Sequence, residues 1–234
     1  MRGTIPGPQN RGQPTARLVR FAPRTAEPKE PQPVSTVALN PRATAAGVLA
    51  DILPGTRVRD ALLVASGAGL TALGAQISIP VPPSPVPITG QTLAVVIAGA
   101  ALGARRGIAS QLLYVLLGLL LPVYADGASG AHVVWGSSGG YLVGFVVAAG
   151  LIGLAAEHGA DRRPLLAALT FAAGQLAVFA IGVPWLKVAA DLSWGDAIHY
   201  GFTVFIFGGI VKAVLAGVVT PSAWRLARRV DGRG

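Results

Sequence analysis

The 234-residue sequence contains no cysteine, which excludes a disulfide framework and a thiolate metal site. Charge is also scarce: only 12% of the residues are Asp, Glu, Lys or Arg, and residues 61–104 include none of them. With 52% hydrophobic residues and a mean hydropathy of +0.59, the chain is too apolar for an ordinary soluble domain. The composition therefore predicts an integral membrane protein with the lipid bilayer as its surroundings.

Motifs for metal-dependent catalysis and for ATP hydrolysis are missing as well. The sequence has no HExxH pattern and no P-loop, and its three histidines, His132, His158 and His199, lack metal-ligand spacing. We therefore expect a protein that is not an enzyme, that holds no cofactor and no metal, and that cannot itself be an ATP-driven motor.

Residues 1–58 are rich in proline and arginine and show no apolar periodicity. This composition predicts a disordered, basic cytoplasmic tail. The region lacks the apolar core of a cleavable secretory signal. An arginine-rich targeting peptide is the alternative, and the acids Glu27, Glu30 and Asp51 argue against it.

After the tail the chain contains six apolar segments, which cover residues 61–75, 90–104, 107–121, 139–156, 165–183 and 203–220. Several are shorter than the roughly 20 residues that cross a hydrocarbon core, and tilt or flanking residues would supply the missing length. We predict an all-α integral membrane fold, with six transmembrane helices in residues 59–224 and a basic cytoplasmic tail over 225–234.

Basic residues are concentrated in every second connection between these segments and at the two ends of the chain. Of the 19 Lys and Arg residues, 17 lie in the N-terminal region, in the connections after the second and fourth segments, and in the C-terminal tail. The positive-inside rule then places both termini in the cytoplasm of a multi-pass cell-membrane protein. Because no aromatic residues are interleaved with the basic ones, we expect no nucleic-acid binding.

The segment 77–92, "ISIPVPPSPVPITGQT", contains five prolines and no charge. Proline removes an N–H donor and favours extended backbone, so this segment cannot be helical. On the predicted topology it lies outside. Irregular backbone at membrane depth is tolerated where it lines a cavity. We interpret the segment as a stiff lid or wall over an outward-opening pocket, with a stiff surface turn as the alternative.

A lone lysine in the last apolar segment is the main candidate for ligand binding. Lys212 has no acid near it in sequence, and such a charge marks a ligand, ion or proton site unless it reaches an interface. Other polar residues lie in or beside the segments, where their alternative role is to bond a neighbouring helix. The candidate substrate-binding residues are Thr89, Gln91, Tyr114, Gly140, Tyr141, Gln175 and Lys212.

Small residues recur at four-residue spacing in the first segment. Ala61, Ala65 and Gly69 share one face, and Ala68 and Ala72 lie beside them. Such a face allows close helix contact. It serves either packing within the protein or docking to a partner membrane protein, and the sequence leaves both open.

The strings "PVPPSPVPIT-x-QT", "L-x-x-Y-x-x-x-G…LPV" and "GGYL-x-GF" resemble the BioY family. "G-x-x-W" at Gly182–Trp185 and "GG-x-x-K" at Gly208–Lys212 extend the resemblance, which covers about residues 60–220. The resemblance implies six membrane helices with an outward-facing site for biotin. It also implies partners, namely a membrane coupling subunit, docked on the small-residue face, and two ATPase subunits of an energy-coupling factor transporter.

One departure from the family pattern concerns the last segment. Where the family usually has "PF-x-PGD-x-x-K", this chain has "VFIFGGIVK", so that Gly209 replaces the acid and both prolines are absent. Gln175 is a candidate substitute for the missing acceptor. Alternative functions are binding of another vitamin by the same kind of subunit, or an integral-membrane enzyme or assembly factor.

Overall fold

The computed structural model describes residue 3, residues 47–52 and residues 57–230, with the side chains of 228–230 excluded. The chain divides into the units Met1–Thr36 and Val37–Gly234, and all described helices belong to the second. Most of the predicted tail, residues 1–58, and the last residues, 231–234, therefore lie outside the described residues.

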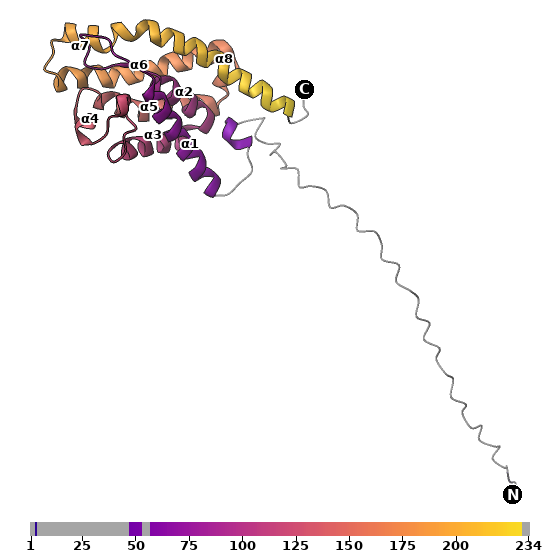
Figure 1. Ribbon diagram of the computed structural model, residues 1–234. Coiled ribbons are helices and arrows are strands. Elements are labelled where there is room, and N and C mark those ends of the chain that lie inside the picture. Colours follow the sequence, from indigo (N-terminus) through magenta and orange to yellow (C-terminus); the bar gives the residue numbers. More distant parts are fainter. Residues whose placement is uncertain (1–2, 4–46, 53–56, 231–234) are drawn as a thin grey trace. The chain divides into compact units, whose positions relative to one another are not determined.

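The described part of the chain is mostly helical (Figure 1). Its α-helices are α1 (Arg57–Gln76), α2 (Gln91–Leu102), α3 (Ala104–Gly118), α4 (Ala131–Trp135), α5 (Gly139–Glu157), α6 (Pro164–Ala189), α7 (Trp194–Gly201) and α8 (Ile206–Val230). Short 3-10 helices are η1 (Leu49–Ile52), η2 (Ala125–Gly127), η3 (Ala160–Arg162) and η4 (Thr203–Phe205). Strands β1 (Ser78–Ile79) and β2 (Ile88–Thr89) form a short antiparallel pair.

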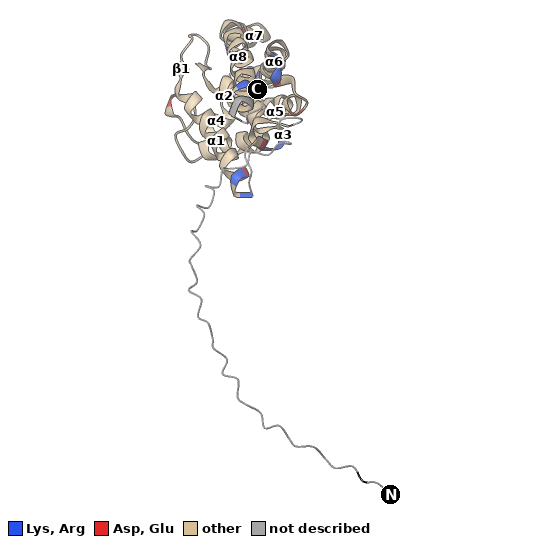
Figure 2. Ribbon diagram, turned by 90° about the vertical axis from the view of Figure 1, so that its right-hand side faces the viewer, with Lys and Arg blue, Asp and Glu red and all other residues tan. Residues whose placement is uncertain are grey.

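Each of the six predicted apolar segments forms a helix, which confirms the all-α prediction. Among the described residues, four stretches are long and apolar enough to cross a membrane: α1, α5, α6 and the run Trp194–Ala227. In contrast, α2 and α3 have 12 and 15 residues. At 1.5 Å per residue they extend roughly 18 and 22 Å, less than a hydrocarbon core of about 30 Å. Figure 2 shows how few charged positions interrupt the ribbon.

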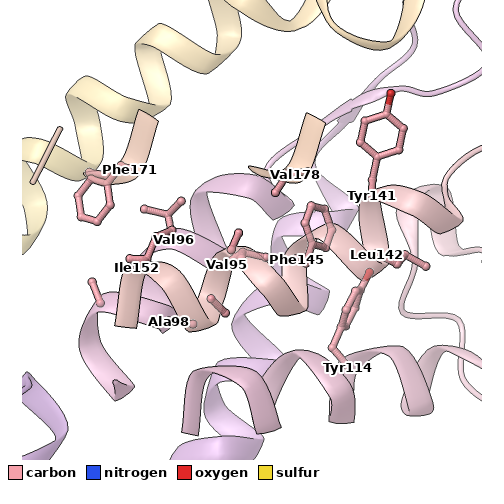
Figure 3. Packing of buried hydrophobic residues seen from close by; sticks show 14 of the residues in the cluster. Val95, Val96, Ala98, Tyr114, Tyr141, Leu142, Phe145, Ile152, Phe171 and Val178 are labelled. Carbon is pink, nitrogen blue, oxygen red and sulfur yellow. The ribbon is translucent and has the colours of Figure 1, made fainter. Parts of the chain in front are cut away.

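Helix α5 lies at the centre and packs against α2, α3 and α6. Figure 3 shows Phe145 and Ile152 of α5 beside Val95 of α2 and Phe171 and Val178 of α6, all of them buried. These side chains form one continuous apolar core. Because α5 is apolar all round, it can pack against these helices on one side and keep Val143, Val147, Leu151 and Leu154 exposed on the other without burying an unpaired polar group.

Residues 47–52 fall within the predicted tail but are packed rather than extended. Val48 and Ala50 are buried, and Asp51 accepts a hydrogen bond from Arg106 at 2.8 Å. Arg106 also lies 3.2 Å from Asp60 of α1. The structure therefore differs from the tail prediction here, because an apolar turn and an ion pair fix this segment against α2 and α3.

A second set of contacts joins η3 to α8 and to the same N-terminal segment. The indole Nε1 of Trp224 donates to Asp161 at 2.5 Å, and Arg162 donates to the Gly47 carbonyl at 3.0 Å. Together with Arg106, these residues define one end of the helical unit, which we call the basic end. Helix α8 continues to Val230, so the predicted C-terminal tail begins as helix.

Candidate functional site

A cavity of about 280 Å³ lies at the end opposite the basic end. Its lining comes from the first turns of α2 and α5, the start of α8, the middle of α6 and the connections that precede these helices. Aromatic walls with a few polar groups are typical of small-molecule sites. The polar and aromatic residues of the lining, together with one glycine, include Thr89, Gln91, Thr92, Tyr141, Gln175, Phe179, Phe205, Gly209 and Lys212.

Lys212 reaches into this cavity from α8. Its Nζ donates to the carbonyl of Thr89 at 2.5 Å and to the hydroxyl of Thr92 at 2.8 Å. An ammonium has three donors, so one N–H remains for a ligand. Sequence reasoning missed Thr92. The available signal was its position three residues after Thr89, on the first turn of a helix that follows the proline segment.

Gln91 stands at the start of α2 inside a chain of hydrogen bonds. Its Oε1 accepts from the Thr89 hydroxyl at 2.8 Å, and its Nε2 donates to the Tyr114 hydroxyl at 2.6 Å. Tyr114 in turn donates to the Val123 carbonyl at 3.1 Å. Tyr114 is fully buried behind Gln91 and does not line the cavity. Its hydroxyl fixes the orientation of the Gln91 amide.

Gln175 of α6 contacts Gly209 of α8 at the cavity wall. Its Nε2 donates to the Gly209 carbonyl at 2.9 Å, which fixes the amide and leaves Oε1 without a hydrogen-bond partner among the described residues. A Cβ at position 209 would lie 3.0 Å from this oxygen. The glycine thus leaves the space that the Gln175 amide occupies. The free acceptor of Gln175 and the donor of Lys212, which follows Gly209 by about one helical turn, therefore both line the cavity.

The apolar wall consists of Tyr141, Phe179 and Phe205. The ring of Tyr141 lies 6.4 Å from each of the other two rings, and its hydroxyl donates to the Gly201 carbonyl at 2.9 Å. Gly140, the neighbour of Tyr141, does not line the cavity. A Cβ there would lie 2.2 Å from the Cβ of Trp185, so Gly140 allows close contact of α5 with α6.

The proline segment forms another wall of the cavity, as its interpretation as a lid requires. Pro85, Val86 and Pro87 line the space, and Val86 is buried. Asp126 and His132, both exposed, also line the cavity, and sequence reasoning did not connect them with the site. The spacing of these two residues in the sequence does not indicate a shared site, because it is the fold of η2 and α4 that brings them to the cavity. Nearby, burial raises the pKa of the Tyr124 phenol.

Residues 136–140, "GSSGG", match the G-x-S-x-G spacing of a serine nucleophile. In hydrolases this motif turns from a strand into a helix, and a histidine hydrogen-bonds the serine. Here it lies between α4 and α5, and within residues 57–230 no side-chain hydrogen bond joins Ser138 to a histidine. The match lacks the context that a catalytic serine needs.

The small-residue face of α1 is only partly open. Ala61, Ala65 and Gly69 are exposed, and a Cβ at Gly69 would meet nothing within 4 Å. Ala72 is half-buried against the core, and Ala68 is 1% exposed. Ala68 therefore packs inside the unit and does not belong to the exposed face.

A helical membrane protein with a cavity of this size, a fixed lysine and an aromatic wall belongs to the class of membrane-embedded small-molecule-binding proteins. The model of the BioY family matches residues 43–229. The chain is 36% identical over 164 residues to Biotin transporter BioY2 of Lactococcus lactis subsp. cremoris, covering 70% of this chain and 88% of that protein. It is also 38% identical over 152 residues to Biotin transporter BioY of Thermotoga maritima, covering 64% and 86%. The chain belongs to the BioY family.

A solved structure shares the fold. It is the S-component for biotin from an ECF-type ABC transporter, with a TM-score of 0.65 and 26% sequence identity over 76% of this chain and 93% of that one. The chain therefore shares the helical fold of that S-component.

Proposed function

We propose that this protein captures biotin from outside the cell and serves as the S component of an ECF-type transporter. The observation that carries the proposal is the cavity of a BioY-family chain, in which a free acceptor on Gln175 and a donor on Lys212 face the same space. The protein is then a transport subunit rather than an enzyme, and it resides in the cell membrane.

Biotin has the groups that this cavity would complement. Its ureido ring offers two N–H donors and one carbonyl acceptor, its thioether ring and chain are apolar, and its far end is a carboxylate. Gln175 Oε1 would accept a ureido N–H, and Lys212 would donate to an acceptor on the vitamin. Thr89, Gln91 and Tyr141 would supply neutral contacts. Tyr114 would act through Gln91, and Gly140 through the packing of Tyr141.

For the fold we propose six spans with both termini in the cytoplasm. The contacts at the basic end support this, because they gather the arginines of the second and fourth connections beside the start of α1 and the end of α8. The cavity then opens outward. Residues 59–224 would form the membrane domain, with residues 1–58 and 225–234 as basic cytoplasmic regions.

The proposed partners are a membrane coupling subunit and two ATPase subunits. The chain's own candidate for contact with the coupling subunit is the exposed part of the small-residue face, Ala61, Ala65 and Gly69. Close approach of two helices requires small side chains at the crossing, and these three lie at four-residue spacing on an unobstructed surface.

The proposal is tested by calorimetry on the full chain purified in detergent. Biotin, riboflavin and thiamine are titrated separately. The bound ligand is then recovered and its mass is measured by mass spectrometry. We expect saturable binding of biotin alone and recovery of unaltered biotin. Binding of another vitamin in preference to biotin would reassign the substrate, and recovery of a chemically altered ligand would point to an enzyme.

A further inference from the structure

The proline segment has little means of attaching itself to the rest of the protein. Five of its residues between 80 and 87 are prolines, which have no N–H to donate. Of the others, the Ser84 N–H donates to the Val81 carbonyl at 2.8 Å and the Val86 N–H to the Ser84 hydroxyl at 3.2 Å. Both bonds stay within the segment. Attachment to another element therefore depends on a side chain.

Ser84 is the side chain that makes this attachment. Its Oγ lies 2.9 Å from the carbonyl of Tyr200, in α7, and 2.9 Å from the carbonyl of Val86. In the described part of the chain, no other hydrogen bond links residues 80–87 to a different element. A serine hydroxyl has one proton, so the two carbonyls share a single donor.

The base of the segment is held more firmly than its tip. Strands β1 and β2 pair through Ser78–Thr89 and Ile79–Ile88. The Gly90 N–H donates to the Ile77 carbonyl at 2.9 Å, and Lys212 donates to the Thr89 carbonyl. Several bonds thus fix the base, whereas the tip is held over the cavity by the buried side chain of Val86 and by one shared hydroxyl proton.

We propose that Ser84 is the positioning residue that fastens this lid to α7, and that small-molecule exchange with the cavity requires the Ser84–Tyr200 hydrogen bond to open. The base of the lid acts as the hinge, and buried Val86 leaves the cavity wall when the tip lifts. The identity of the exchanging molecule, biotin, rests on the proposed function, but the opening of the lid does not.

A ligand-free test uses the absence of cysteine from the chain. Leu142→Cys places a thiol in the buried part of the cavity lining, and its rate of reaction with a maleimide reports how often the lid opens. In the Ser84→Ala background we expect this rate to rise about 2- to 12-fold, the effect of losing one hydrogen bond. Ser84→Thr, which keeps the hydroxyl, should restore the parent rate. A thiol at exposed Ala131, outside the cavity, should react equally in all backgrounds.

A second measurement follows biotin exchange in otherwise unmodified chains by stopped flow. Ser84→Ala should raise the dissociation rate constant by the same 2- to 12-fold factor, with Ser84→Thr again close to the parent. An unchanged labelling rate in Ser84→Ala overturns the lid contact. Faster labelling with unchanged biotin dissociation overturns its role in exchange. Faster labelling in a protein that binds no biotin leaves the lid in place and removes the proposed function instead.

Discussion

Lys212 shows how a charge is kept inside an apolar helix bundle. Sequence alone offered no acid to pair with it, and the structure supplies the carbonyl of Thr89 in β2 and the hydroxyl of Thr92 in α2 instead. Such bonds offset part of the free energy of removing an ammonium from water. The lysine consequently joins α8 to α2 and at the same time directs a donor toward the cavity.

Replacing Lys212 by methionine keeps the apolar stem and removes the donor. A charge-assisted hydrogen bond contributes about 1.5–3 kcal/mol, so biotin should bind about 10- to 150-fold more weakly in calorimetry. The matched control is Lys187→Met, since Lys187 lies outside the cavity and contacts the ring of Trp194. Parent-like affinity in a well-folded Lys212→Met protein would assign the lysine to helix packing alone.

At the scale of the element, α1 presents two surfaces with different neighbours. Ala65 is exposed, whereas Ala68 is buried against the other helices. The same substitution on the two surfaces therefore separates docking from packing. The half-buried Ala72 is less suitable, because a larger side chain there would disturb both.

We expect Ala65→Leu to reduce biotin uptake by cells that contain the coupling subunit and the ATPases, while biotin binding to the isolated subunit stays at the parent level. Ala68→Leu should lower both, because overpacking a core position costs about 1–3 kcal/mol. Radiolabelled uptake and calorimetry provide the two measurements. If Ala65→Leu also abolishes binding, the exposed face is needed for folding and the docking proposal fails.

The contact between η3 and α8 contains a buried acid. Asp161 is 1% exposed, one of its oxygens accepts from Trp224, and the other has no partner among the described residues. Burial raises the pKa of this carboxyl, although the Trp224 hydrogen bond and the charge of Arg162 act in the opposite direction. The folded protein therefore holds this proton more tightly than the unfolded chain does.

The stability of the parent should accordingly fall as the pH rises through the window between the ordinary carboxyl pKa of about 3.9 and the raised folded value. Asp161→Asn keeps an acceptor for Trp224 and does not titrate. Near neutral pH the variant should unfold at the same or a higher temperature than the parent, and its relative advantage should shrink on acidification. Thermal unfolding in detergent measures this, and an advantage that grows at low pH would contradict it.

For the whole molecule, the cavity and the basic end occupy opposite ends of the helical unit. This polarity follows from side-chain contacts, and it agrees with the distribution of arginine along the sequence. We expect the short helices α2 and α3 each to cross the membrane, because the positive-inside rule places their arginine-containing connection in the cytoplasm.

Single cysteines in the otherwise cysteine-free chain test the topology. An impermeant maleimide should label Ala131→Cys in intact cells, and it should label Arg105→Cys and Ala227→Cys only after permeabilisation. The expected sidedness follows from the positive-inside rule. Labelling of Arg105→Cys from outside would show that α2 and α3 do not form a pair of spans, and labelling of Ala227→Cys from outside would invert the predicted topology.

The sequence by itself indicated the membrane class and the positions of the six apolar helices, because these depend on local composition, whereas the short helices α4 and α7 were not predicted. Lipid exposure requires long apolar segments, and a segment without N–H donors cannot continue a helix. Lys212 stood out for the same reason, as a charge alone in an apolar stretch. The family strings added the expectation of a vitamin site.

Only the tertiary structure decided which of the polar residues meet. Tyr114 and Gln91 are 23 residues apart and hydrogen-bonded, yet only Gln91 lines the cavity. Gln175 and Gly209 come from different helices, and the glycine matters because it leaves space for the amide. Ser84 and Tyr200 meet across 116 residues. Hydrogen bonds and close contacts of this kind depend on how helices pack, and helix packing is set by many side chains at once.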